Sequence, residues 1–493
     1  MGAHWVTVRA MSPTSGAPKA RYPKQIPYII GNEAAERFSF YGMRNILTVF
    51  LINYLLLNEI GDTEARTQTA KATFHLFVSG VYFFPLLGGY LADRFLGKYR
   101  TILYLSVLYC VGHLFLALFE DNKAGFYSGL ALIALGSGGI KPCVSAFVGD
   151  QFDESNKELV KGVFGLFYWI INFGSFFASL LIPMTLTKYG PAVAFGIPGL
   201  LMLIATIIFW AGRNHYVDVP PTGKNPDSFL KVVFTALRAP KTAGGDWLSR
   251  AEGRHPTESV EGARAVFRVM GIFAAIPIFW ALFDQKASTW VVQATQMNLN
   301  VGSFRLEPSQ LQALNPLMVM LLIPLNSFVI FPWLERRGWS PTALRRMTAG
   351  MFIAGISFVM VGMIQVSMDT GRDMSVLWQV APYLVLTLSE VLVSATGLEF
   401  AYSQAPREMK GTIMSFWNLT VTIGNLLVAG VAAINIFEST SGSLFFYAAL
   451  IFLAAMVFAF MASRYKVRDY YQKASVPVLG EHSEPTDPGG TRA

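Results

Sequence analysis

The chain has 493 residues and a formal net charge of +8, and its composition excludes a water-soluble protein. Hydrophobic residues make up 53% of the chain and charged residues only 14%, whereas soluble domains carry about 25% charged residues. So few polar groups could not cover a soluble protein of this length, and the same composition excludes a disordered chain and a nucleic-acid-binding protein. We therefore expect an all-α polytopic membrane protein embedded in a lipid bilayer.

Twelve segments are long and apolar enough to be membrane-spanning helices, each of which needs about 20 residues. In chain order the predicted spans are 26–57, 73–93, 100–119, 125–148, 162–186, 191–212, 266–290, 310–334, 343–367, 376–403, 411–436 and 442–463. An even number places both termini on the same side. Lys and Arg are more numerous in the short loops on that side, which predicts cytoplasmic termini in a multi-pass protein of the cell inner (cytoplasmic) membrane.

Polar stretches divide the chain. Residues 1–24 lack an apolar core and are predicted to be a flexible arm rather than a signal peptide, and residues 465–493 a flexible tail. Residues 213–263 are predicted to be a cytoplasmic linker between two six-helix bundles, 25–212 and 264–464. Two six-helix bundles joined by a central linker are the plan of the major facilitator fold, in which the substrate site lies between the halves near the bilayer midplane.

The first predicted helix carries a polar stripe. Glu33, Glu36, Arg37, Tyr41 and Arg44 are spaced so that all five lie on one face of a helix. Because charges in a bilayer are costly, this stripe is expected to line a water-filled cavity. Two carboxylates beside an arginine are suited to load and release a proton when their spacing changes slightly. The alternative is a buried ion-pair network that only fixes helix packing.

Two further polar residues lie within apolar segments of the first half. His75 shares a helix face with Ser79 and Tyr82, and a histidine can relay a proton near neutral pH, although a purely structural histidine fits equally well. Lys141 lies in the segment GSGGIKPC, where small residues permit close helix packing. A lysine at membrane depth requires a carboxylate partner, and the candidates are Glu33, Glu36 and Glu390.

The second half contributes charges of its own. Asp284 is predicted to lie at the outer end of the seventh helix, level with Arg44, so an Arg44–Asp284 ion pair would act as a gate between the halves. The alternative partner of Asp284 is its neighbour Lys286. Glu390 is expected to face the cavity from the tenth helix. Glu399 lies about 180° around the helix from it and is expected to be structural.

Several motifs together resemble those of the proton-dependent oligopeptide transporter (POT/PTR) family of the major facilitator superfamily. The segment EAAERFSFYG at 33–42 resembles the family's ExxERFxYYG motif, and FYWIINFG at 167–174 its FYxxINxG motif. GGIKP at 138–142 and LSEVLVSATGLEFAYSQAP at 388–406 also match family segments. This chain departs from the family pattern at Phe40 and Thr396, and its linker lacks the two extra helices of many bacterial relatives.

The resemblance implies a bacterial-type symporter that imports di- and tripeptides with protons by alternating access. It assigns Arg37 and Lys141 to the peptide carboxylate and Glu390 to the amino group, with Lys141 and Glu390 also in the gating set. It assigns Glu33 and Glu36 to proton exchange and to pairing with Lys141, and Asp284 and His75 to coupling. The residues that it places against the peptide backbone are Tyr41, Tyr82, Asn172 and Asn315.

The residues support this substrate class independently. A zwitterion with variable side chains needs a cation at one end, an anion at the other and an adaptable aromatic middle, for which we expect Tyr41, Tyr82, Trp290 and Trp417. We find no nucleophile–base or metal-ligand spacing in the sequence, so we predict no cofactor, no metal and no catalytic residues. We also predict a functional monomer. One alternative is a carrier of nitrate or another anion, which has no use for Glu390. Another is a receptor or scaffold, which does not need the full set Glu33, Glu36, Arg37, Lys141 and Glu390.

Overall fold

The computed structural model describes residues 22–467, except for 154–155, 224, 241–244, 405, 407–408 and 438, and except for the side chains of 157 and 161. The predicted terminal arms therefore lie almost entirely outside the described residues. Within these limits the protein is helical apart from one short antiparallel strand pair, β1 (Asn300–Val301) and β2 (Phe304–Arg305).

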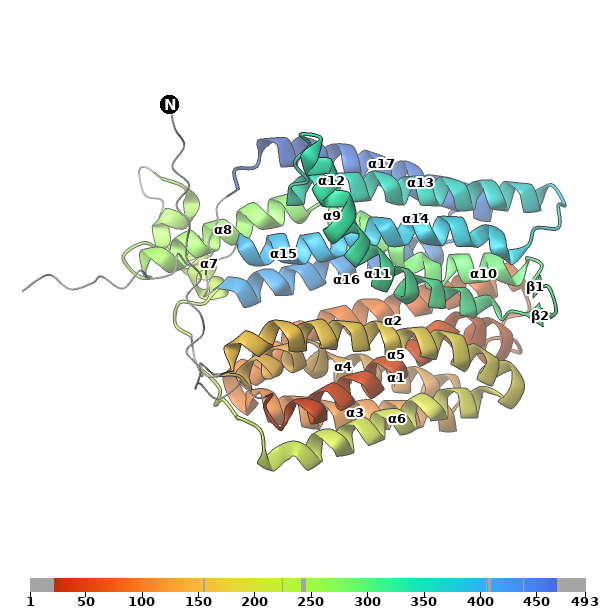
Figure 1. Ribbon diagram of the computed structural model, residues 1–493, viewed down its shortest axis with the longest axis horizontal. Coiled ribbons are helices and arrows are strands. Elements are labelled where there is room, and N and C mark those ends of the chain that lie inside the picture. Colours follow the sequence, from red (N-terminus) through yellow and green to blue (C-terminus); the bar gives the residue numbers. More distant parts are fainter. Residues whose placement is uncertain are drawn as a thin grey trace, which may run out of the picture.

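Six long helices form the first half (Figure 1). They are α1 (Ile26–Phe50), α2 (Thr63–Leu91), α3 (Gly97–Leu118), α4 (Lys123–Asp150), α5 (Val160–Tyr189) and α6 (Pro191–Ala211). Short helical segments adjoin them at η1 (Leu51–Leu55), η2 (Ala92–Leu96), η3 (Lys157–Leu159) and η4 (Gly212–Asn214). Helix α2 begins at Thr63 rather than at residue 73, because the Asp62 side chain caps it by accepting a hydrogen bond from the Ala65 amide.

The second half is more broken. Its seventh span consists of α8 (Thr257–Phe273), α9 (Ile276–Phe283), η6 (Asp284–Ala287) and α10 (Thr289–Thr295). Its eighth consists of η7 (Pro308–Ala313), α11 (Leu314–Leu325), η8 (Asn326–Ile330) and α12 (Phe331–Arg336). The remaining spans are α13 (Ala343–Asp369), the series η9 (Val376–Gln379), α14 (Val380–Glu390), η10 (Val391–Ala395) and α15 (Thr396–Ser403), then α16 (Lys410–Ile434) and α17 (Thr440–Arg464).

All twelve predicted spans coincide with helices. By length and hydropathy alone, nine helices of the described chain could cross a membrane, or ten if the pair Thr257–Phe273 and Ile276–Thr295, bent by 50°, is one span. One of the nine, Thr63–Leu118, contains two predicted spans joined through η2. Helix α1 falls outside that set because its charged stripe interrupts the apolar sequence.

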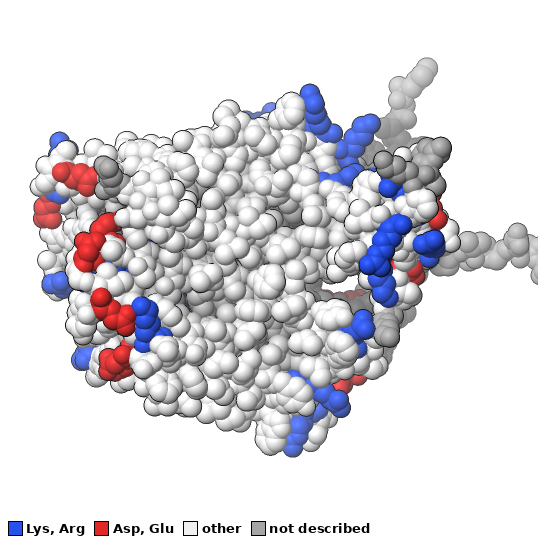
Figure 2. Space-filling model, turned by 180° about the vertical axis from the view of Figure 1, so that it is seen from behind, with Lys and Arg blue, Asp and Glu red and all other residues white. Residues whose placement is uncertain are grey.

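Helices α1–α6 and α8–α17 lie in two groups, and the connecting segment lies at one end of both (Figure 1). We call the end that holds the connecting segment the linker end, and the end that holds β1 and β2 the hairpin end. A broad band of uncharged surface separates two charged ends in Figure 2, and Lys and Arg predominate at the linker end. The uncharged band is the surface expected of a protein that crosses a bilayer.

Each half has its own apolar core, with buried clusters centred on Phe50, Phe126 and Phe195 in the first and on Phe279, Trp290 and Tyr383 in the second. Small residues let helices of one half approach closely, since a Cβ atom placed on Gly88 of α2 would collide with the backbone of Gly138 in α4. The small residues of GSGGIKPC are therefore required by packing.

The predicted linker is partly ordered. It contains α7 (Phe229–Arg238) and η5 (Trp247–Ala251), and α8 begins at Thr257, within the range predicted to be linker. Arg264 of α8 forms ion pairs with Asp246 at 2.6 Å, with Glu252 at 3.0 Å and with Glu261 at 2.5 Å. The hydrogen bonds from Arg264 hold the pKa of the Asp246 carboxyl well below its usual range. These contacts attach the connecting segment to the second half.

Candidate functional site

The charged stripe of α1 folds into a compact ion cluster. Arg37 Nε lies 2.6 Å from Glu33 Oε1 and 2.8 Å from Glu36 Oε2. The Glu33 side chain is 2% exposed, that of Glu36 is fully buried, and that of Arg37 is 11% exposed. One guanidinium therefore serves two buried carboxylates, and a proton added to either of them weakens its hold on Arg37.

The contacts of Lys141 differ from those that the sequence predicts. Its Nζ lies 4.3 Å from the ring centroids of both Phe40 and Tyr82, and among the described residues it forms no ion pair. The expected pairing of Lys141 with Glu33 or Glu36 is absent, and the ion-pair partner of both glutamates is Arg37. Phe40, which departs from the family motif, thus supplies one of two aromatic faces that hold the ammonium.

A second polar cluster lies in the other half. Asn315 Nδ2 donates to Glu390 Oε2 at 2.6 Å, and Asn315 Oδ1 accepts from Lys286 Nζ at 3.0 Å. The same amide nitrogen lies 3.1 Å from Thr387 Oγ1. A neutral amide therefore stands between the carboxylate and the ammonium, and Lys286 forms no direct ion pair with Glu390. The sequence left Lys286 without a role.

Charges of opposite halves meet nearer the hairpin end. Arg44 Nη2 lies 2.5 Å from Asp284 Oδ1, and Asn425 Nδ2 donates to Asp284 Oδ2 at 2.7 Å. The Arg44–Asp284 contact is the one that the sequence predicts. The alternative partner, Lys286, is directed to Asn315 instead.

His75 belongs to the same contact. Its Nδ1 lies 2.7 Å from Asn425 Oδ1 and its Nε2 lies 2.8 Å from Ser288 Oγ, and the ring is fully buried. Since Asn425 uses its amide nitrogen to donate to Asp284, its oxygen accepts a hydrogen bond from His75 Nδ1. The ring of His75, in the first half, is therefore hydrogen-bonded only to groups of the second half among the described residues.

Further hydrogen bonds join the halves at or beyond the middle of the helices towards the hairpin end. Thr48 donates to Ala287 O, Gln310 to Leu180 O, and Gln312 to Asn45 O. Near the middle, Ser79 donates to Thr422 O. The hairpin end is thus closed by hydrogen bonds and one ion pair.

Tyr41 lies where the charges of both halves converge. Its hydroxyl is within electrostatic range of Arg37 and Arg44 of its own helix and of Glu390 in the other half. Tyr168, in the FYWIINFG segment, is also within range of Glu390 and Tyr41. Tyr168 was missed because only Asn172 was taken from that motif. Lys141, Tyr82, Asn315 and Glu390 are each partly exposed.

Other predicted site residues lie elsewhere. Trp290 is fully buried against Phe358 and Tyr383, and Trp417 is 4% exposed against Phe273 and Trp280. Contrary to the prediction that both tryptophans line the cavity, their side chains pack in the core of the second half. Asn172 lies near the site, but its amide donates to Tyr168 O at 3.0 Å.

Comparison with known proteins identifies the family. The model of the POT family matches residues 99–441. The chain belongs to the POT family. It is 38% identical over 371 residues to solute carrier family 15 member 2 of Homo sapiens, covering 71% of this chain and 50% of that protein. It is 38% identical over 373 residues to peptide transporter 3 of Caenorhabditis elegans, covering 71% and 51%. The chain thus spans about half the length of the curated relatives that it matches.

Solved structures share the fold over their whole length. A POT family transporter named PepTSo is 51% identical, with a TM-score of 0.86, covering 92% of this chain and 100% of that chain. An auto-inhibited POT family peptide transporter is 50% identical, with a TM-score of 0.85, covering 92% and 99%. The all-α, two-bundle membrane fold predicted from the sequence is therefore the fold of this family's transporters.

Proposed function

We propose that this protein is a proton-coupled symporter that carries di- and tripeptides across the cell inner membrane by alternating access. The observation that carries this proposal is a pair of opposite charges from the two halves, Lys141 of α4 and Glu390 of α14, neither of which has an ion-pair partner among the described residues. Two ends of one zwitterion can bridge such a pair of opposite charges, whereas a nitrate carrier has no use for Glu390.

The roles within the site follow from which charges are already neutralised. Lys141 is held only by two aromatic rings among the described residues, so it is the cation most available to a peptide carboxylate. Glu390 is hydrogen-bonded to a neutral amide rather than to a cation, so a peptide amino group would have no other cation to displace from it. Asn315, Tyr41, Tyr82 and Asn172 then contact the backbone common to all peptides.

Proton coupling is assigned to Glu33 and Glu36. A proton on either carboxylate frees part of the Arg37 guanidinium, which then strengthens the cationic end of the peptide site. Release of that proton on the other side restores the ion cluster and weakens peptide binding. His75 and Asp284 act at the contact that closes the hairpin end and opens when the halves rock.

Orientation follows from charge. We infer that the linker end and both termini face the cytoplasm, and the Lys and Arg that predominate on the surface at the linker end (Figure 2) support this by the positive-inside rule. The closed hairpin end is then the outer one. We further propose that the protein is a transporter rather than an enzyme, works as a monomer, and requires no cofactor beyond protons.

The test is uptake of a labelled dipeptide into proteoliposomes. An inward proton gradient should drive accumulation, and a protonophore should abolish it. Unlabelled di- and tripeptides should compete, whereas nitrate and single amino acids should not. Accumulation without a proton gradient, or competition by nitrate alone, would contradict the proposal.

A further inference from the structure

A small polar pocket at the hairpin end has no part in the proposed peptide site. It is lined by residues of α2, of the η6–α10 turn and of the α16–α17 connection, among them Lys71, Gln68, Gln285, Thr289, Asn435 and Tyr447. Helix α2 belongs to the first half and the other elements to the second. The pocket therefore lies across the boundary between the halves.

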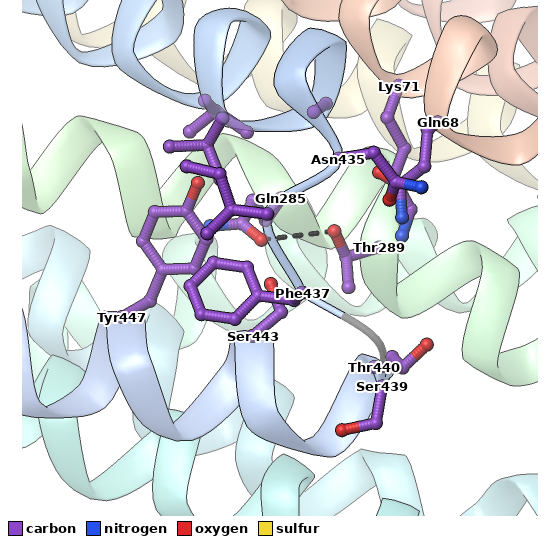
Figure 3. Close-up of a pocket in the computed structure, with 14 residues that line it drawn as sticks. Gln68, Lys71, Gln285, Thr289, Asn435, Phe437, Ser439, Thr440, Ser443 and Tyr447 are labelled. Atoms are coloured by element: carbon purple, nitrogen blue, oxygen red, sulfur yellow. Dashed lines mark hydrogen bonds between the residues drawn. The ribbon is translucent and has the colours of Figure 1, made fainter. Parts of the chain in front are cut away.

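Lys71 is a buried cation without a partner in this pocket. It is 6% exposed, and among the described residues it forms no hydrogen bond or ion pair. In Figure 3 its side chain extends from α2 towards Thr289. On the same helix, Glu64 accepts a hydrogen bond from Gln68 at 2.6 Å and acts on Lys71 only as a charge at a distance. A buried ammonium without a counter-charge is costly, so an anion in this pocket would remove a large penalty.

Tyr447 adds a second unpartnered donor. It is 2% exposed, and its hydroxyl has no hydrogen-bond partner among the described residues. It lines the pocket from α17, across from Lys71 in Figure 3. By contrast, Thr289 and Gln285 satisfy each other with a hydrogen bond of 3.0 Å. The two buried polar side chains of the pocket that lack a partner among the described residues are thus both hydrogen-bond donors, which suits an anion rather than a cation.

The size of the pocket limits the occupant. The space open to the centres of water-sized molecules is about 20 Å³, which is enough for a water molecule or a small ion. A peptide is too large. We propose that this pocket binds one small inorganic anion, such as chloride, beside Lys71.

Anion binding here has a consequence for conformation. The pocket exists only while α2 of the first half lies against the η6–α10 turn of the second, and Gln285 directly follows the gate residue Asp284. A ligand that binds only one arrangement shifts the equilibrium towards it. The bound anion therefore stabilises the arrangement that is closed at the hairpin end.

The test uses thermal unfolding of the purified full chain in sodium chloride, sodium bromide or sodium gluconate at equal pH and ionic strength. Chloride and bromide should raise the Tm saturably, because a ligand that binds only the folded state stabilises it, whereas gluconate is too large to bind. Lys71→Gln should abolish this shift. Lys188→Gln removes an exposed lysine from the same end of the protein and should leave it intact.

Two further measurements protect the test against a variant that fails to fold. Lys71→Arg keeps the positive charge in the pocket and should retain a saturable rise of the Tm with chloride. Crystals of the unmodified protein grown in bromide should show an anomalous peak beside Lys71 Nζ. No saturable halide shift in the unmodified protein, an equal shift in Lys71→Gln, or no bromide peak would overturn the proposal.

Glu438 requires a separate control. It stands between the pocket residues Phe437 and Ser439 in the sequence but lies outside the described residues. If its carboxylate neutralises Lys71, chloride should not change the Tm of the unmodified protein but should raise the Tm of Glu438→Gln. This result would overturn the proposal. If an anion fills the pocket, both proteins should respond. These readouts require no transport, so their outcome is independent of the peptide assignment.

Discussion

Charged residues at the interface between the halves are arranged differently at two depths. Towards the hairpin end, Arg44 of one half is paired directly with Asp284 of the other. Deeper in the helices no ion pair joins the halves among the described residues, since Arg37 is paired with two glutamates of its own helix, and Asn315 stands between Lys286 and Glu390 of the second half. At the hairpin end the two halves are therefore joined without a ligand. Deeper in the helices, opposite charges of the two halves are left for a ligand to bridge.

The largest effect is expected from breaking the inter-half pair. Arg44→Ala leaves the Asp284 carboxylate buried without its cation, which should lower the free energy of unfolding by about 3–5 kcal/mol. Adding Asp284→Asn should restore part of the loss, because no buried charge is then left unpaired. Chemical denaturation of the single and double variants measures both.

Lys98→Ala is the matched control for the gate. Its ion pair with Asp150 lies within the first half and is partly exposed, so its loss should cost about 1 kcal/mol or less. Equal losses in Lys98→Ala and Arg44→Ala would mean that the inter-half pair has no special part in closing the hairpin end.

The next largest effect concerns the mid-helix charges. Lys141→Ala should weaken dipeptide binding by roughly 10–100-fold, since a hydrogen bond to a charged group is worth about 1.5–3 kcal/mol. Ligands that lack a free carboxylate should be affected much less. Isothermal titration measures both affinities, with the exposed Lys123→Ala as a control. Unchanged dipeptide affinity would remove Lys141 from the site.

Proton coupling should fail when the first-half cluster loses a titratable group. A gradient of one pH unit is worth about 1.4 kcal/mol per proton, or roughly tenfold accumulation. Glu33→Gln or Glu36→Gln should abolish this accumulation. Exchange of labelled for unlabelled peptide should persist in both variants. Equal stimulation by a pH gradient in the unmodified protein and in both variants would show that the coupling residues are elsewhere.

The smallest effect lies outside the interface, at the linker end. Because Arg264 depresses the pKa of Asp246, the stability contributed by this pair is present above the usual aspartate pKa of about 3.9 and is lost as pH falls towards the depressed value. Asp246 is 44% exposed, so solvent screening should keep the contribution below about 1 kcal/mol. Asp246→Asn should flatten the acid limb of a stability–pH profile, and an unchanged limb would contradict this.

The sequence predicts the fold and part of the site. Twelve apolar segments and one charged helix face specify the spans and the orientation of α1, because the bilayer penalises any other arrangement. The Arg44–Asp284 contact is predictable because both residues are expected at the same depth. The POT family motifs add residue assignments that hydropathy alone does not provide.

The partners within each half could not be predicted. Whether Arg37 or Lys141 takes the glutamates depends on rotamers and on the rings of Phe40 and Tyr82, which spacing does not specify. The role of Lys286 depends on Asn315, which comes from a different helix. Trp290 illustrates the same limit, since an apolar aromatic residue suits a core as well as a cavity wall.

The most direct test compares affinities for an ordinary dipeptide and for forms blocked at one end. In the unmodified protein, amidation of the carboxylate and acetylation of the amino group should each cost binding energy. The penalty for amidation should vanish in Lys141→Ala and that for acetylation in Glu390→Gln, with each variant retaining the other penalty. If both penalties persist unchanged in both variants, Lys141 and Glu390 do not hold the two ends of a peptide.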